Sequence, residues 1–178
     1  MTFALETIGL DKQFGGLHVT RDLSLKIAAG ARHALIGPNG AGKTTVINLL
    51  TGVIKPNGGK IRLEGADITG LTVQARVLRG LSRTFQINQL YADLTPLETI
   101  GLAVSERLGH GGDWWRRLGT RADVNVEIAE TLARFHLLDV MNEPTGTLPY
   151  GKQRLLEIAL AIATKPRVLL LDEPAAGV

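Results

Sequence analysis

The chain contains no cysteine among its 178 residues. A disulfide framework and a thiolate metal site are therefore excluded, and the cytosol is the natural compartment. The sequence also has no run of 18 apolar residues that could cross a bilayer as a helix. Residues 1–10 lack the basic start and apolar run of a secretory signal. We therefore expect any membrane contact to go through a partner.

Clusters of like charge are also absent. The net charge is +3, but lysine and arginine are scattered and no run of five like charges occurs, so we expect no nucleic-acid binding. The four histidines show no metal-ligand spacing: His18, His33, His110 and His136. With 44% hydrophobic and 21% charged residues, the composition is that of a single globular domain with a sizeable core.

Short strands are predicted near both ends of the chain. Residues 3–27 alternate apolar and polar side chains in places and break at Gly15-Gly16, which indicates two strands joined by a turn. Compact apolar or alternating runs predict further strands at His33–Ile36, Lys60–Leu63, Ser82–Gln86 and Val168–Leu171. The last of these is fully apolar, as is typical of a central strand buried on both faces.

Helices are predicted between these strands. Thr95, Pro96 and Glu98 form an N-terminal capping signal. Residues 109–119, which hold Trp114 and Trp115, predict a loop or a locally folded insertion. Helical periodicity resumes at residues 123–138, and residues 153–163 predict a buried helix.

A glycine-rich loop lies between the predicted strand His33–Ile36 and the helical residues 46–50. It matches the P-loop pattern, in which backbone N–H groups surround phosphates at a helix N-terminus. Lys43 is expected to reach the β- and γ-phosphates of a nucleotide, and the Thr44 hydroxyl to bind Mg²⁺. The expected nucleotide-binding residues of this loop are Gly37, Pro38, Asn39, Gly40, Ala41, Gly42, Lys43, Thr44 and Thr45.

Two acidic residues follow the apolar run Val168–Leu171. Phosphoryl transfer to water needs a metal fixed from two sides and a nucleophile held in line. Asp172 is expected to hold the Mg²⁺ shell, and Glu173 to polarise the attacking water. On its own such a run is also typical of a strand that leaves the core, so the metal-site interpretation depends on the P-loop.

Three ordered motifs resemble those of an ABC-transporter ATPase: the P-loop, the stretch Leu148–Arg154 and the run Asp172–Gly177. The resemblance covers essentially the whole chain. Within that family the sequence is similar to the ATP-binding subunits of branched-chain amino-acid importers, because Arg83-Thr84-Phe85-Gln86 is followed by Leu94-Thr95.

The resemblance implies an α/β P-loop NTPase core with an N-terminal antiparallel β portion and a helical subdomain over about residues 87–164, within one domain covering residues 1–178. It implies ATP and Mg²⁺ as cofactors. It also implies that Phe14 stacks on adenine, where the alternative is a strand-end aromatic packed on the core. Gln86 matches the glutamine that contacts magnesium and the lytic water.

The signature stretch departs from the general family pattern, because Pro149 stands where most members carry serine. The phosphate donors must then come from the backbone, and Gly151 permits a close approach. Lys152 and Arg154 lie in the first turn of the following helix, where the macrodipole disfavours cations unless an anion docks there. A phosphate brought by a second subunit would fit; the alternative is that both side chains bend away into solvent.

The function that this resemblance implies is ATP hydrolysis coupled to solute import at the cytoplasmic face of a bacterial inner membrane. Its partners would be a second ATPase subunit, membrane permeases and, indirectly, a periplasmic binding protein. Amides, urea and aliphatic amino acids remain open as solutes.

Two alternatives remain beside this function. One is a soluble ABC-type ATPase without a transport role. The other follows from the end of the chain, since the family places a switch histidine downstream of Asp172 and none of the four histidines follows it. We therefore expect a catalytic domain that is C-terminally incomplete, and a nucleotide-binding fragment that is weakly active or inactive by itself.

Overall fold

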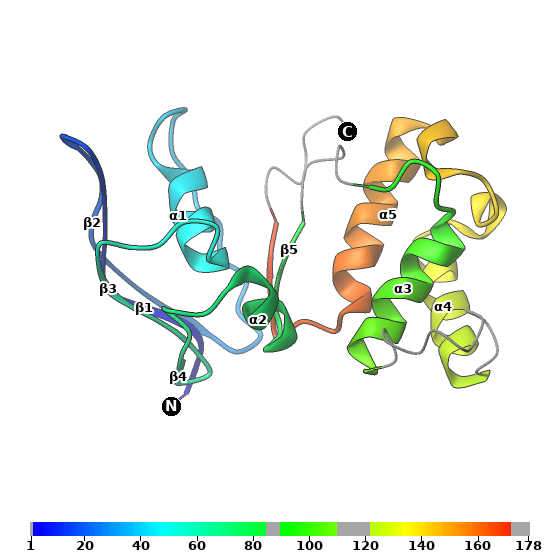
Figure 1. Cartoon of the computed structure of the whole chain (residues 1–178), viewed down its shortest axis with the longest axis horizontal. Coiled ribbons are helices and arrows are strands. Elements are labelled where there is room, and N and C mark those ends of the chain that lie inside the picture. The colour runs from blue at the N-terminus through cyan, green and yellow to red at the C-terminus, as the bar shows by residue number, and fades with distance from the viewer. Residues whose placement is uncertain (1, 85–89, 110–121, 172–178) are drawn as a thin grey trace. The chain divides into compact units, whose positions relative to one another are not determined.

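The structure, a computed structural model, describes residues 2–84, 90–109 and 122–171 (Figure 1). It divides into two compact units, Met1–Ser82 and Arg83–Val178. Among the residues described, no helix is long and apolar enough to cross a membrane. Strands and helices occur together in the chain, which confirms the predicted α/β class.

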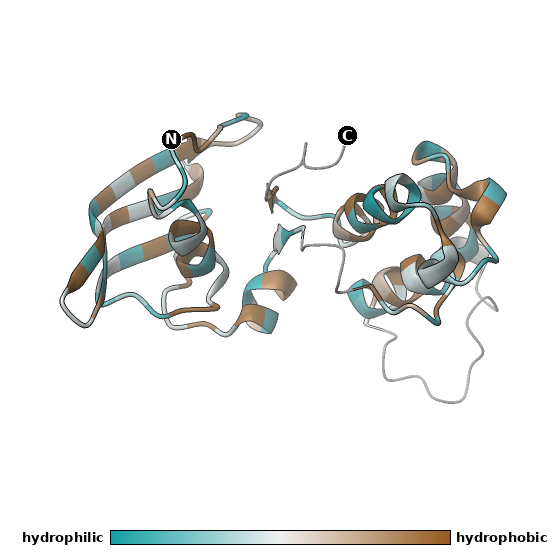
Figure 2. Ribbon diagram, turned by 90° about the horizontal axis from the view of Figure 1, so that it is seen from above, coloured by the Kyte–Doolittle hydropathy of each residue, from teal (hydrophilic) through white to brown (hydrophobic). Residues whose placement is uncertain are grey.

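The N-terminal unit contains a four-stranded antiparallel sheet. Its strands are β1 (Phe3–Phe14), β2 (Leu17–Ala28), β3 (Gly58–Leu63) and β4 (Ala66–Asp67), in the order β2-β1-β3-β4. The predicted strand pair with a turn at Gly15-Gly16 is therefore confirmed. Apolar and polar residues alternate along these strands (Figure 2), and the apolar set buries Leu5, Leu10 and Ile61. Burial of this one face drives formation of the sheet.

Two helices complete this unit, α1 (Lys43–Thr51) and α2 (Val73–Leu78). Helix α1 buries Val46, Leu49 and Leu50. It ends at Gly52, whose backbone has a positive φ of 82° and whose N–H donates to the Leu49 carbonyl at 3.2 Å. Such a left-handed glycine is the usual end of a helix.

The predicted strand at His33–Ile36 is wrong. These residues have no regular secondary structure, and Leu35 and Ile36 are 47% and 89% exposed. Neither of the two sheets in the described part of the chain includes them. An apolar run forms a strand only when a neighbouring strand pairs its N–H and C=O groups, and this segment has no such neighbour there.

The second sheet has two short strands, β5 (Leu81–Arg83) and β6 (Val168–Leu170). The N–H of Thr84 extends the pairing by donating to the Leu170 carbonyl at 3.0 Å. Both strands were expected, but β6 is half-buried rather than buried on both faces. Among the residues described β6 pairs only with β5, so it is not the central strand that its apolar run predicted.

The helices α3 (Pro96–Arg107), α4 (Ala122–Arg134) and α5 (Tyr150–Ala163) form the core of the C-terminal unit, with short 3₁₀ turns η2 (Leu138–Val140) and η3 (Thr145–Thr147). Ile100, Val104, Leu132 and Leu156 pack into one buried cluster. Helix α4 ends before the predicted residue 138, because His136 has a positive φ of 53° that a right-handed helix does not allow. Trp114 and Trp115 lie outside the described residues.

The N-terminus of α3 has the capping box that its sequence predicts. The Thr95 hydroxyl accepts from the Glu98 N–H at 3.2 Å, and the Thr95 N–H donates to the Glu98 carboxylate at 2.9 Å. Two of the N–H groups that a helix start leaves unpaired are satisfied in this way. The Thr95 N–H and, second, the Thr95 hydroxyl both donate to the Glu98 carboxylate, and these two bonds lower the pKa of Glu98.

We expect Thr95→Ala to lower the free energy of unfolding by about 1 kcal/mol, because the hydroxyl that caps α3 is lost. Urea denaturation followed by circular dichroism measures this change. Ser105→Ala, in the interior of the same helix, is the matched control and should change stability by less than about 0.5 kcal/mol. Equal stability of Thr95→Ala and the native chain would contradict a stabilising role for the cap.

Candidate functional site

The glycine loop ahead of α1 adopts a conformation that depends on its glycines. Gly40 and Gly42 have positive φ angles of 80° and 86°, which glycine adopts without steric strain. The left-handed Gly42 starts α1 at Lys43, and its carbonyl accepts the first helical hydrogen bond from the Val46 N–H at 3.0 Å. A Cβ at Gly42 would lie 3.2 Å from the Val19 side chain of β2. The loop therefore packs closely on the sheet at this one point.

The Lys43 side chain folds back over the loop. Its ammonium donates to the carbonyls of Gly37 at 2.6 Å and Pro38 at 2.8 Å. Residues 38–41 are exposed, and so is Thr44. The N-terminus of α1 thus combines accessible backbone, a cation and a hydroxyl, which is the donor set that a triphosphate and a hard metal ion require.

Phe14 ends β1 and is 48% exposed. The Lys12 ammonium lies 5.0 Å from the centre of its ring and also donates to the Lys55 carbonyl at 2.8 Å. The Gln13 N–H donates to the Asn57 side chain at 2.8 Å. The end of the hairpin is therefore tied to the segment before β3, while the ring of Phe14 stays accessible to a planar ligand.

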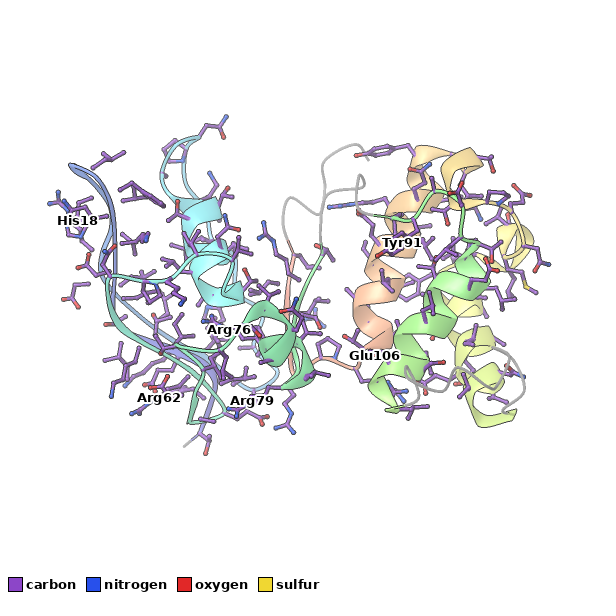
Figure 3. All side chains as sticks on the ribbon, in the orientation of Figure 1. His18, Arg62, Arg76, Arg79, Tyr91 and Glu106 are labelled. Atoms are coloured by element: carbon purple, nitrogen blue, oxygen red, sulfur yellow. The ribbon has the colours of Figure 1, made fainter. Side chains whose placement is uncertain are left out.

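The β1–β2 turn and the loop before α1 lie at the same end of the N-terminal unit (Figure 1). Beside them lies His18 of β2 (Figure 3), whose ring nitrogen Nε2 is within hydrogen-bond distance of the Asp11 carboxylate of β1. The packing of Val19 against Gly42 joins β2 to the loop. Sequence patterns had not indicated Val19, Lys12 or Asp11, because their roles depend on contacts between distant segments.

The signature stretch begins helix α5. Pro149 is the N-cap and makes no side-chain capping bond. Gly151 is exposed, and a Cβ added to it would meet nothing within 4 Å. The first turn of α5 is therefore accessible at Gly151, and the approach of a phosphate to it stays a prediction.

The alternative that both basic side chains of this turn bend away into solvent is wrong, and the docking of a phosphate there stays a prediction. The Lys152 ammonium donates to the Asp139 carboxylate at 2.8 Å and also to the His136 carbonyl. The hydrogen bond from Lys152 lowers the pKa of Asp139. Arg154 is 8% exposed and pairs with Glu157 at 2.6 Å. Each cation is therefore paired with an acidic side chain of the same unit.

Burial also affects the ion pair between Arg154 and Glu157. It raises the pKa of Glu157, while the hydrogen bond from Arg154 acts in the opposite direction. Breaking such a pair by removing one partner is strongly destabilising, since the other charge stays buried. Arg154 thus belongs to the buried face of α5.

Three predicted site residues lie outside the described residues: the catalytic residues Gln86 and Glu173 and the magnesium ligand Asp172. Within the parts of the chain that are described, no group of three or more His, Cys, Asp or Glu side chains could hold a metal ion. Thr44 is the one predicted magnesium ligand with a described position, and its exposed hydroxyl is a hard oxygen donor that suits Mg²⁺.

Comparisons with known proteins agree with this geometry. The ABC transporter family matches residues 20–176. The high-affinity branched-chain amino acid transport ATP-binding protein BraF of Pseudomonas aeruginosa is 41% identical over 180 residues, which cover 97% of this chain and 70% of BraF. The corresponding protein LivG of Salmonella typhimurium is 40% identical over 176 residues, covering 95% of this chain and 68% of LivG.

Solved structures are similar as well. A nucleotide-free ATP-binding cassette from an ABC transporter superposes with a TM-score of 0.82 at 28% identity, covering 100% of this chain and 71% of that one. An ATP-binding cassette in its ADP conformation gives a TM-score of 0.82 at 29% identity, with the same coverage.

The fold and the loop around Lys43 define a nucleotide-binding α/β protein of the P-loop type. The chain belongs to the ABC transporter family, as an ATP-binding subunit with the ATPase activity of that family. The family resemblance predicted from the three sequence motifs is therefore confirmed.

Proposed function

We propose that this chain hydrolyses ATP to drive an importer for branched-chain amino acids or related small polar solutes. The observation that carries the proposal is the glycine loop at the N-terminus of α1, with Lys43 folded over it and Thr44 exposed. The relatives named for branched-chain amino acid transport, at 41% and 40% identity, support the solute class.

The proposed binding site uses residues from both ends of the sequence. Residues 37–45 hold the phosphates, Phe14 stacks on the adenine, and Gly151 presents the first turn of α5 to a nucleotide bound on a second subunit. The proposed magnesium ligands are Thr44, Gln86 and Asp172, and the ion, when bound, would neutralise charge on the phosphates. Glu173 orients and polarises the attacking water.

The proposed assembly contains two ATPase subunits and membrane permeases at the cytoplasmic face of the inner membrane, with a periplasmic binding protein as an indirect partner. Motion of the membrane subunits would follow closure of the two ATPase subunits on ATP. The helices α3, α4 and α5 fall within the helical subdomain that we propose for residues 87–164.

We expect deletion of the gene to reduce uptake of labelled leucine, isoleucine or valine at low external concentration to the background of the host. An ATPase subunit supplies the free energy for transport, so accumulation against a gradient should stop without it. Uptake of labelled urea and of glutamine in the same cells is the control, and a plasmid copy should restore the lost uptake. Loss of urea or amide uptake alone would move the transporter to another solute class, and unchanged uptake of every solute would contradict a transport role.

A further inference from the structure

Arg76 of α2 is almost completely buried, with an exposed fraction of 1%. It lies between α2 and the C-terminal end of α1 (Figure 3). In the described part of the chain its side chain donates four hydrogen bonds, all to backbone carbonyls. A fully buried arginine is rare unless its charge and its N–H groups are satisfied. The burial of the Arg76 guanidinium therefore needs an explanation in its hydrogen bonds.

Two of these hydrogen bonds hold the C-terminus of α1. One terminal nitrogen, Nη1, donates to the Leu49 carbonyl at 2.8 Å and to the Leu50 carbonyl at 2.6 Å. Both carbonyls belong to the last turn of α1, where the regular helical ladder supplies no N–H four residues on, and the Leu49 carbonyl also accepts from the Gly52 N–H. The last turn also carries the negative end of the helix dipole, which a cation stabilises. Arg76 is thus the cap of α1.

The other two hydrogen bonds hold the segment that leads into α2. Nη2 donates to the Thr69 carbonyl at 2.8 Å, and Nε donates to the Leu71 carbonyl at 3.2 Å. The planar guanidinium therefore joins two segments that are separated in the sequence. A lysine ammonium could not match this arrangement, because its donors radiate from a single atom.

Gly52 leaves the space that this guanidinium occupies. A Cβ at Gly52 would lie 2.8 Å from Arg76 Nε and 3.0 Å from Cζ, closer than real Cβ contacts occur. The residue that ends α1 and the residue that caps it therefore fit together. No sequence pattern had indicated this pair, because Arg76 and Gly52 belong to different elements.

We propose that Arg76 is a positioning residue for ATP. It fixes helix α1 at its C-terminal end, so that the N-terminal end of α1 and Lys43 meet the phosphates. The loop at the near end is exposed from Pro38 to Ala41 and packs on β2 at Gly42, so the orientation of α1 also depends on the contacts at its far end. A nine-residue helix moves as one body about 13 Å long. A tilt at the end held by Arg76 therefore displaces Lys43 at the other. The inference rests on the proposed role of residues 37–45 in binding ATP.

Arg76→Lys tests this proposal, because it keeps the positive charge but cannot reproduce the four bonds. We expect the affinity for ATP, measured by calorimetry at a temperature where circular dichroism shows the variant to be folded, to fall about tenfold or more, since small misplacements of binding groups have effects of this size. Arg62→Lys is the matched control. Arg62 lies on β3 of the same unit, is half-buried and forms a 3.9 Å ion pair with Glu6, which lysine can keep, so its replacement should leave affinity unchanged.

A double-mutant cycle separates positioning from a loss of stability. In the background of Lys43→Ala, the change Arg76→Lys should weaken ATP binding by a clearly smaller factor than in the native background, because one of the contacts that Arg76 positions is already absent. A lower melting temperature with unchanged ATP affinity of the folded protein would overturn the proposal, and so would equal effects in both backgrounds. If Lys43→Ala itself leaves ATP binding unchanged, the proposed phosphate site fails first, and the two failures are thus distinguishable.

A second variant covers the case in which Arg76→Lys does not fold. Gly52→Ala does not change the residue at position 76, but it adds a methyl group 2.8 Å from the Nε atom of Arg76. The guanidinium must then move off the carbonyls of α1, and the same loss of ATP affinity is expected. Folded Gly52→Ala protein with the native affinity for ATP would contradict the proposed coupling.

Discussion

Replacing Lys43 by alanine should lower the affinity for ATP about a hundredfold. In the structure the Lys43 ammonium donates to the carbonyls of Gly37 and Pro38, the first two residues of the loop. A triphosphate would replace these neutral acceptors with charged ones, and hydrogen bonds to charged groups contribute about 1.5–3 kcal/mol each. Two such bonds lost together correspond to about 3 kcal/mol, or about two orders of magnitude in the dissociation constant.

The measurement is titration of the purified chain with ATP in the presence of Mg²⁺, by calorimetry or with a fluorescent ATP analogue. Lys60→Ala is the matched control, because Lys60 is an exposed lysine on β3 of the same unit. The control should bind ATP like the native chain. An unchanged affinity in Lys43→Ala, with the control also unchanged, would rule out the loop as the phosphate site.

Elements with local signals could be predicted from the sequence. The β1–β2 hairpin forms because an apolar face meets a glycine turn, and α3 starts at Thr95 because the capping residues are neighbours in the chain. Helix α1 starts at Lys43 because Gly42 has a left-handed conformation that ends the loop. In each case the determining residues lie within a few positions of one another.

Features that depend on a distant partner could not be predicted. The run His33–Ile36 has the composition of a strand, yet no strand pairs with it among the residues described. Lys152 was expected to meet solvent or a phosphate, but Asp139 lies close enough in space to bind it. The choice of partner is a tertiary property, and periodicity carries no information about it.

The candidate site divides in the same way. The glycine spacing around Lys43 identifies the loop because backbone conformation at each position depends on the residue itself. The support of the loop was not visible in the sequence, since Val19 contacts Gly42 from another element and Arg76 holds the far end of α1. A motif indicates the atoms that meet the ligand, whereas the contacts that fix those atoms in space come from the fold.

Glu173→Gln should leave ATP binding intact and slow hydrolysis about a hundredfold to a thousandfold. The amide has the shape of the carboxylate but cannot accept the proton of the attacking water, and general bases contribute rate factors of about 10² to 10⁴. Glu173 directly follows Asp172 in the sequence, so the substitution leaves the proposed magnesium ligand in place. With hydrolysis slowed and binding retained, the ATP-bound dimer should accumulate.

Phosphate release from the assembled transporter measures the rate, and light scattering with ATP measures the dimer. Glu143→Gln, an exposed glutamate in the C-terminal unit, is the matched control and should hydrolyse ATP at the native rate. The two readouts must change together, because a carboxylate that acts only on the water lowers the rate without lowering affinity. Native turnover in Glu173→Gln would show that another group activates the water, while a loss of ATP binding would instead assign Glu173 to the nucleotide or its metal ion.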